Sequence, residues 1–246
     1  MSWHPKEIAA LLWDRRPWLV LTGAGISTES GIPDFRTPQT GLWEQYDPVE
    51  VLSTEALFER PQVFFGVGFR VLMRFKNARP NRAHEILAEW EKRGLVEAVV
   101  TQNIDGLHIE AGSRRVLEIH GHLRSGHCVM CHASFPIEVL EEKVARGEVP
   151  PRCPCGGMIR PDVVLFGDML PPCFEEATEL AHRLPLLVIG SSLQVSPANF
   201  LPSYTPLLGI INLTPTPFDW KARFVIHEKA SLALEALHRE LLPKFP

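Results

Sequence analysis

Short, uninterrupted apolar runs recur along this chain, and they constrain its fold more than any other feature. They are rich in β-branched residues and lack the polar–apolar alternation of a strand with one wet face. Continuous runs of this kind predict strands that are buried on both faces, as in a parallel sheet. The predicted strands span residues 18–22, 96–101, 116–119, 163–166, 186–189, 209–213 and 224–226.

Helical periodicity appears between the predicted strands. One helix is predicted at residues 80–93, where Gly94 follows as a stop signal, and a C-terminal helix is predicted at residues 231–242. Their apolar stripes are Ala83, Ile86, Leu87 and Trp90 in the first helix and Leu232, Leu234, Leu237 and Leu241 in the second. Strands that alternate with helices predict a doubly wound α/β fold.

Two regions interrupt this alternation and are predicted to be insertions into the sheet domain. The first, residues 35–80, has a helical pattern, and the second, residues 121–159, contains two pairs of cysteines. We therefore expect one domain over residues 1–246. Its sheet part comprises residues 1–34, 81–120 and 160–246, with a helical module and a cysteine-rich module inserted.

The composition is that of a globular protein that can bury a sizeable core, because 45% of the 246 residues are hydrophobic and 22% are charged. A formal net charge of −4 argues against direct binding to nucleic acid, because such proteins usually carry a basic face. No apolar run approaches the length of a membrane span, and the N-terminus lacks the pattern of a signal peptide. We therefore expect a cytoplasmic protein that does not engage membranes.

Four of the five cysteines form two close pairs, which predicts a metal site. Cys128 and Cys131 have the spacing of a metal-binding knuckle, and Cys153 and Cys155 follow with one spacer residue instead of the usual two. Four thiolates suit tetrahedral zinc, and four protein ligands leave no open position for chemistry. We therefore expect a structural zinc ion. Four thiols without metal in a small subdomain are the alternative.

Two histidines and the fifth cysteine are not counted among the expected zinc ligands. His127 and His132 flank the first cysteine pair and are alternative ligands, but we expect both to be exposed instead. Cys173 stands alone before a predicted helix. Lone cysteines are usually small buried hydrophobes, so we assign it no role.

A glycine-rich turn directly after the first predicted strand suggests nucleotide binding. Gly23 and Gly25 begin a G-x-G pattern, but Thr28 occupies the position of the third glycine. No acidic residue ends a second strand about twenty residues on, which disfavours an ordinary hydride-transferring dinucleotide enzyme. A tight turn between a strand and a helix, without a ligand, is the alternative interpretation.

Polar residues also follow other predicted strands. Residues 101–108 (TQNIDGLH) end one strand, Gly190, Ser191 and Ser192 follow another, and Asn212 lies at the end of a third. The carboxyl ends of strands are where ligands bind in open α/β sheets. Glycines, hydroxyls and amides at these ends suit the phosphates and riboses of a nucleotide, so we expect one shared cleft.

Six motifs together resemble one known family, the sirtuins. In chain order they are GAGISTESGIPDFR at residues 23–36, TQNIDGLH at 101–108, IHGH at 119–122, the four paired cysteines, RPDVVLFGD at 160–168 and GSSL at 190–193. The resemblance covers about residues 18–230. It implies a Rossmann-like NAD-binding domain with an inserted helical module and an inserted zinc module, NAD as co-substrate and zinc as a structural ion.

The resemblance also implies an activity. Sirtuins are NAD-dependent protein-lysine deacylases, so we expect acyl-lysine proteins or peptides as substrates, removal of acetyl, and release of nicotinamide and O-acetyl-ADP-ribose. His120 matches the general base, a role that suits an imidazole near neutral pKa. Asn103 and Asp105 complete the implied catalytic set by ordering the nicotinamide ribose and its pocket; an N-cap of a short helix over residues 106–111 is a second role open to Asp105.

Two other functions compete with deacylation. A protein mono-ADP-ribosyltransferase would use the same NAD site but would depend less on His120. A non-catalytic, zinc-containing interaction module would tolerate the loss of His120 and would show a basic face if it bound nucleic acid. The acidic balance of charge argues against the second alternative.

The resemblance carries a set of cofactor contacts onto this chain. Phe35 would shield the reacting ribose from water, and Ile32 would line the pocket with Ala24. The residues implied to contact NAD are Gly23, Ala24, Gly25, Thr28, Asp34, Phe35, Arg36, Gln102, Asn103, Ile104, Asp105, Gly190, Ser191, Ser192, Asn212, Leu213 and Ala230.

A further set is implied to bind the substrate. Residues 163–167 would pair with the peptide backbone as an added strand, a mode that accepts many sequences. The implied contacts are Val163, Val164, Phe166 and Gly167, with Phe166 in the wall of the acyl-lysine tunnel. A plain sheet strand is the alternative for Val164 and Leu165.

One departure bears on the choice of acyl group. Sirtuins that prefer succinyl and similar acidic groups carry a Tyr-x-x-Arg pattern in the helical module. Residues 64–71 of this chain read FFGVGFRV, with no tyrosine. We therefore expect an apolar pocket that prefers acetyl or longer fatty acyl groups over succinyl.

Overall fold

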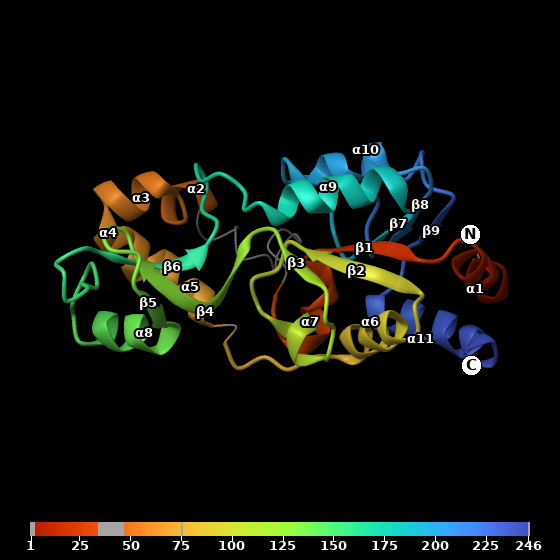
Figure 1. Cartoon of the computed structure of the whole chain (residues 1–246), viewed down its shortest axis with the longest axis horizontal. Helices are drawn as coiled ribbons and strands as arrows, with labels where there is room; N and C mark the ends of the chain where they lie inside the picture. Colours follow the sequence, from red (N-terminus) through yellow and green to blue (C-terminus); the bar gives the residue numbers. More distant parts are fainter. Residues whose placement is uncertain (1–2, 34–46, 75, 246) are drawn as a thin grey trace.

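The computed structural model describes residues 3–33, 47–74 and 76–245, and it shows two lobes (Figure 1). The larger lobe is built on a six-stranded sheet, and the smaller lobe is built on a three-stranded sheet. In the described residues, each lobe is assembled from parts that are distant in the sequence. In the described part of the chain, no helix is both long and apolar enough to cross a membrane.

The large sheet is entirely parallel, with the order β3-β2-β1-β7-β8-β9. This is the strand order of dinucleotide-binding doubly wound folds, whose direction of winding reverses between the two central strands, here β1 and β7. The predicted fold class is therefore confirmed. The strands are β1 (Trp18–Thr22), β2 (Val96–Thr101), β3 (Val116–Glu118), β7 (Leu186–Ile189), β8 (Leu208–Ile211) and β9 (Phe224–Ile226).

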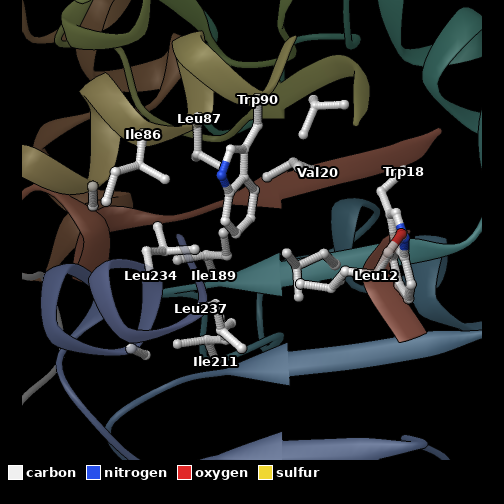
Figure 2. Close-up of a cluster of buried hydrophobic side chains, with 14 of the residues drawn as sticks. Leu12, Trp18, Val20, Ile86, Leu87, Trp90, Ile189, Ile211, Leu234 and Leu237 are labelled. Carbon is white, nitrogen blue, oxygen red and sulfur yellow. The ribbon is translucent and has the colours of Figure 1, made fainter. Parts of the chain in front are cut away.

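Helices cover both faces of this sheet, which explains why its strands are uninterrupted apolar runs. Side chains alternate between the faces, so Val20 packs into one core while Leu19 and Leu21 pack into the other. In the first core, Trp90 extends from its helix toward Ile189 on β7 (Figure 2). The side chains of both cores are close to fully buried, so this lobe gains most of its stability from apolar burial.

The helices of the large lobe divide between the two faces. One face carries α1 (Pro5–Asp14), α6 (Arg82–Lys92) and α11 (Ala230–Leu241), and the other carries α9 (Cys173–Arg183) and α10 (Leu201–Tyr204). Shorter turns of helix are α7 (Leu107–Glu110) and the 3-10 segments Ala24–Ile26, Thr28–Ser30, Ala198–Phe200 and Leu242–Lys244.

The two helices predicted from periodicity are confirmed as α6 and α11, within two residues at each end. Asn81 begins α6 by accepting a hydrogen bond from Ala83 N at 2.9 Å. One position of the C-terminal stripe is wrong, because the Leu232 side chain is 56% exposed. Ala233 takes the inward position instead, since it lies about 100° further round the helix, beside Leu234 and Leu237.

The small lobe packs an antiparallel sheet against short helices. Its strand order is β5-β4-β6. The strands are β4 (Gly121–Cys128), β5 (Ser134–Pro136) and β6 (Ile159–Val163), and the longest helix is α8 (Ile137–Ala145). The helical region adds α2 (Pro48–Val51), α3 (Thr54–Glu59), α4 (Pro61–Val63), a π-helical turn, η4 (Phe64–Gly68), and α5 (Phe69–Met73).

The helical region and the cysteine-rich region share one hydrophobic core. Phe64, Phe65 and Phe69 from the first are buried together with Leu140 and Ile159 from the second. The rings of Phe64 and Phe65 meet edge to face, with their centroids 4.9 Å apart. The two expected insertions therefore pack against each other rather than standing apart on the sheet domain.

The strand predicted at residues 163–166 is wrong. The strand lies earlier, at Ile159–Val163, and it pairs with β4 in the small sheet instead of joining the parallel sheet. Val163 and Leu165 are buried, but in the core of the small lobe. An apolar run reports that a segment is buried, and it carries no information about which sheet buries it.

Candidate active site

The central strands of the large sheet end in two loops that interlock. Gly23 N donates to Ile189 O at 3.2 Å, and Gly25 N donates to Gly190 O at 2.8 Å. A Cβ atom on Gly25 would lie 2.8 Å from the Cα atom of Gly190, so the close approach requires glycine. Two short 3-10 turns, and no long helix, follow this loop in the described residues. The interlocked loops mark the topological switch point, where such sheets bind ligands.

A directional hydrogen-bond network lies beside these loops. Asn103 Nδ2 donates to Gly23 O at 3.2 Å and to Ser27 Oγ at 3.1 Å, and Ser27 Oγ donates to Asp105 Oδ2 at 2.7 Å. Asp105 Oδ1 accepts from Leu107 N at 3.0 Å, at the start of α7. The N-cap of α7 is Gly106, so Asp105 lies one residue before the N-cap position that was predicted for it. Its carboxylate still accepts from the first helical N–H and belongs to the strand-end network at the same time.

Burial and hydrogen bonding shift the pKa of Asp105 in opposite directions. Burial raises the pKa of its carboxyl group above the ordinary value, and the hydrogen bonds from Leu107 N and Ser27 Oγ oppose part of that rise. Both of these partners donate, so the network is complete when the carboxyl group is ionised.

His120 lies where the two lobes meet. Its Nδ1 atom is 3.0 Å from Gln102 O, and a carbonyl only accepts, so Nδ1 carries a proton and the neutral ring keeps a lone pair on Nε2. Burial lowers the pKa of His120 below the ordinary value, and the bond to Gln102 opposes this in part. The backbone O of His120 accepts from Val164 N at 2.9 Å, which links the backbone at His120 to the substrate segment predicted at residues 163–167.

Two buried histidines lie beneath this network. His108 Nε2 is 2.9 Å from Thr22 Oγ1, and His84 Nε2 is 3.5 Å from Ser27 Oγ. The two imidazole rings meet edge to face, with their centroids 4.8 Å apart. Burial lowers the pKa of His84 to about 4 and that of His108 well below its ordinary value. Both imidazoles are therefore neutral near pH 7.

Ser27, His84 and His108 are not among the site residues predicted from the sequence. A signal was present for His84, because a histidine falls between the apolar positions Ala83 and Ile86 of an otherwise buried stripe. Polar groups in buried positions need partners, so such a residue points to a hydrogen-bonded site.

The far end of the sheet edge is occupied by Asn212 and the start of α11. Asn212 is buried, and its amide donates to Thr214 O at 2.7 Å, whereas Leu213 is 62% exposed. Ala230 is buried at the first position of α11. Glu29 accepts hydrogen bonds from Ser231 at that helix start, so the glycine-rich segment and α11 are joined.

The four paired cysteines converge on one point in the small lobe. Their sulfurs all lie within 4.8 Å of one another; Cys128 Sγ is 3.4 Å from Cys155 Sγ, and Cys131 Sγ is 3.6 Å from Cys153 Sγ. Zinc–sulfur bonds of about 2.3 Å place tetrahedral sulfurs about 3.8 Å apart, so the thiols fit a zinc ion. A Cβ atom on Gly157 would lie 2.6 Å from Cys128 Sγ, so the chain after the second cysteine pair passes close to the cluster.

The flanking histidines are not part of that sulfur cluster. His132 is exposed, as expected, and His127 Nδ1 is 2.5 Å from Asp162 Oδ1 with its side chain 38% exposed. Ser125 also donates to Asp162. His127 is therefore turned toward β6 and away from the thiols.

A cleft of about 540 Å³ opens between the lobes. Gly121, Val163 and Val164 line it from the small lobe, and Glu118 and Cys173 line it from the large lobe. Cys173 is half-buried here. The cleft runs along the segment at which a substrate peptide is expected, directly beside the backbone of His120.

Comparison with known proteins gives a consistent result. The Sir2 family model matches residues 23–197. A relative from Caldanaerobacter subterraneus subsp. tengcongensis, named NAD-dependent protein deacetylase 2, is 57% identical over 93% of this chain and 92% of its own length. A relative from Geobacillus kaustophilus, named NAD-dependent protein deacetylase 1, is 46% identical over 95% of this chain and 97% of its own length.

This chain belongs to the Sir2 family.

Solved Sir2 structures also superpose on this Sir2-family protein. A Sir2 variant with a deacetylated p53 peptide and 3'-O-acetyl ADP-ribose matches with a TM-score of 0.92 at 38% identity, over 97% of this chain and 98% of that one. Sir2 with a p53 peptide and NAD+ matches with a TM-score of 0.89 at 38% identity, over the same shares. The Rossmann-like fold expected from the resemblance is therefore confirmed.

The residues predicted to contact NAD in a Sir2-family protein occupy four places relative to the described structure. Asp34, Phe35 and Arg36 lie outside the described residues. Those gathered at the switch point are Gly23, Ala24, Gly25, Thr28, Gln102, Asn103, Asp105, Gly190, Ser191 and Ser192. Asn212, Leu213 and Ala230 lie further along the sheet edge, and Ile104 bonds through its carbonyl to Leu123 N of the small lobe.

Proposed function

We propose that this Sir2-family protein is an NAD-dependent protein-lysine deacetylase that releases nicotinamide and O-acetyl-ADP-ribose. The observation that carries the proposal is His120, which keeps Nε2 available as a base while Nδ1 is held by Gln102. The names of the relatives support the same activity. The proposed substrates are acyl-lysine proteins or peptides, and the net charge of −4 makes nucleic acid an unsuitable ligand.

The strand-end residues suit NAD as co-substrate. When bound, NAD supplies a sugar carbon that loses nicotinamide and accepts the acyl oxygen. We assign Asn103 and Asp105 to the nicotinamide ribose, because a shared Ser27 hydroxyl holds their amide and carboxylate in one place. We assign the phosphates and the adenosine side of NAD to Gly190, Ser191, Ser192, Asn212, Leu213 and Ala230. The residues proposed to form the pocket and the cofactor loop are Gly23, Ala24, Gly25, Thr28, Asp34, Phe35, Arg36, Gln102 and Ile104.

His120 acts as the general base in this proposal. The Nε2 atom takes up a proton from the substrate side, and Gln102 O stabilises the imidazolium through the Nδ1 proton. A pKa lowered by burial keeps the ring unprotonated at neutral pH, so Nε2 is free to accept a proton.

In this proposal the small lobe binds the acyl-lysine. Val163, Val164 and Gly167 would pair with the peptide backbone, and Phe166 would form one wall of the acyl tunnel. Arg70 and Arg74 of the helical region are exposed, whereas Phe64, Phe65 and Phe69 are buried. This arrangement supports an apolar acyl pocket, so we propose that acetyl is preferred over succinyl.

We propose that the three modules predicted from the sequence have separate functions. Residues 1–34, 81–120 and 160–246 would bind NAD, with β6 counted in the small lobe to which it pairs. Residues 35–80 and 121–159 would supply the acyl pocket and the zinc site. Zinc is assigned a structural role, since all four of its ligand positions are filled by cysteine.

Mass spectrometry of a reaction with NAD and matched acetyl- and succinyl-lysine peptides tests this function. The wild-type protein is expected to yield free lysine, nicotinamide and O-acetyl-ADP-ribose, faster with acetyl than with succinyl. His120→Ala is expected to lower turnover by about 10²–10⁴-fold, the usual contribution of a general base. His182→Ala, a change of the same type at an exposed position on α9, is the control and is expected to leave the rate unchanged.

Three outcomes would contradict parts of the proposal. A near-wild-type rate in His120→Ala would remove the general base. Faster succinyl removal would keep the family activity and overturn the apolar pocket. ADP-ribose attached to protein, without any deacylated peptide, would favour the mono-ADP-ribosyltransferase.

A further inference from the structure

A tight turn at Leu165–Asp168 presents an exposed aromatic ring. Asp168 N donates to Leu165 O at 3.0 Å, and Gly167 has a φ of +96°, as the third residue of a type II turn requires. Phe166 occupies the second position, and 43% of it is exposed. A large apolar side chain at the tip of a well-fixed turn is suited to contact a ligand.

An ion pair closes this turn from the side of β6. Arg160 Nη1 donates to Asp168 Oδ1 at 3.1 Å and Arg160 Nη2 to Asp168 Oδ2 at 2.5 Å, in a bidentate arrangement. Arg160 Nη2 also donates to Val163 O at 3.1 Å, and Leu165 N donates to Asp168 Oδ2 at 2.9 Å. The two charged side chains are only 12% and 21% exposed, so water screens the pair weakly.

The loop between α2 and α3 holds the same turn from the opposite side. Phe166 N donates to Leu52 O at 3.0 Å, and Thr54 N donates to Phe166 O at 2.9 Å. These two bonds form a parallel bridge between Ser53 and Phe166. A Cβ atom on Gly167 would lie 2.5 Å from Thr54 Oγ1, so the loop and the turn are in close contact.

The 52–54 loop thus holds the backbone of Phe166 directly, and Arg160 and Asp168 hold the neighbouring residues of the turn, while the Phe166 ring stays exposed. We propose that Arg160 and Asp168 are positioning residues, which hold the turn against the 52–54 loop and so set the place of the Phe166 ring in the acyl-lysine tunnel. The inference rests on the proposed deacetylase function and adds specificity-determining residues to it. Neither side chain takes part in the hydrogen bonds of the Asn103 and His120 network, so their loss is expected to affect peptide binding selectively.

Steady-state kinetics with an acetyl-lysine peptide tests the positioning role. Asp168→Ala removes the ion pair and the acceptor for Leu165 N, and it is expected to raise the peptide KM by about 10-fold, with kcat and the KM for NAD within about 2-fold of wild type. Asp168→Asn keeps an oxygen for Leu165 N and is expected to give a smaller rise. Glu142→Gln, which removes an exposed carboxylate paired with Arg146 in the same lobe, is the matched control and is expected to change neither KM.

A double-mutant cycle asks whether Asp168 acts through Phe166. If it does, Phe166→Leu raises the peptide KM by itself, and adding Asp168→Ala raises it little further. Fully additive effects on KM would overturn the proposal, and so would a fall in kcat with an unchanged peptide KM. Circular dichroism and zinc content establish that each variant is folded, and Asp168→Asn keeps the test available if the alanine variant does not fold.

The wild-type protein separates this inference from the proposed function. Deacetylation by wild type with an unchanged peptide KM in both Asp168 variants would overturn the positioning role alone. Absence of deacetylation by wild type would overturn the proposed function, and the positioning role with it.

Discussion

The two lobes reach stability by different means. The large lobe sandwiches one parallel sheet between two apolar cores, and its helices α6, α9 and α11 span eleven or twelve residues each. In the described residues, the small lobe has a three-stranded sheet, helices of three to nine residues and one core, and that core includes Cys128 and Cys153. A lobe with a small sheet and short helices depends on additional links, and the four converging thiols provide one.

This contrast divides the candidate site as well. The residues proposed to bind NAD lie mainly at strand ends of the large lobe, where the backbone is held by a complete parallel sheet. The residues proposed to bind the peptide lie in the small lobe, one strand away from the cysteines. The NAD side should therefore tolerate the loss of metal better than the peptide side does.

Removal of zinc is the strongest test of this difference. We expect chelation to unfold the small lobe, because structural zinc contributes about 10–16 kcal/mol in zinc-finger peptides. Hydrogen exchange is expected to increase throughout β4, β5 and β6, while β1, β2 and β7 remain protected. Unchanged exchange in the small lobe after proven loss of metal would contradict the structural role of the ion.

A pair of cysteine variants controls for effects of the chelator. Cys131→Ser removes one proposed ligand and is expected to reproduce the exchange pattern of the metal-free protein. Cys173→Ser changes the cysteine outside the cluster and is expected to retain one zinc ion and wild-type exchange. Equal zinc content and equal hydrogen exchange in the two variants would contradict the conclusion that the small lobe depends on metal and the large lobe does not.

The core of the large lobe is tested by Trp90→Ala. Trp90 is fully buried between α6 and the sheet (Figure 2), and its removal is expected to lower the free energy of unfolding of this lobe by about 3–5 kcal/mol. Trp220, which is 82% exposed, offers the matched control, and Trp220→Ala is expected to change stability by less than about 0.5 kcal/mol. Denaturant titration of the zinc-loaded protein measures both, and similar losses would show that burial does not decide the stability of this lobe.

Acid is expected to weaken the large lobe by a smaller amount. The pKa of His84 falls from 6.5 to about 4 on burial, so between these values the unfolded chain binds a proton that the folded protein does not. Stability from this group is complete above pH 6.5 and decreases as the pH falls toward 4, by about 3 kcal/mol in total. His84→Gln should remove the part of this dependence that His84 contributes and leave the part contributed by His108, whose pKa burial also lowers.

Exchange of the amides in β1 and β2 measures the acid effect in the large lobe alone. This choice matters because acid also protonates thiolates, which would release zinc and affect the small lobe. A slope between pH 6.5 and 4 that His84→Gln leaves unchanged would show that another group is responsible.

Local pattern was sufficient for most of the large lobe. The run at residues 186–189 and the stripe of α6 were predictable because a strand buried on both faces and a helix with one buried face leave different apolar periods. The same reasoning failed for the strand at Ile159–Val163, whose neighbour in the sheet is β4. It also failed for Leu232, where apolar character alone did not show which way the side chain faces.

The sequence by itself determined the segments that form the parallel sheet, the four thiols, the motif order that identifies the family, and therefore the chemistry to be expected. These features follow from residue type and spacing, because local conformational preferences and metal-ligand chemistry depend on those two properties. Only the tertiary structure decided that the helical and cysteine-rich regions share one core, that Ser27 joins Asn103 to Asp105, and that Arg160 and Leu52 converge on the Phe166 turn. Those contacts join residues far apart in the chain, and they exist because packing and the demand of buried polar groups for partners bring them together.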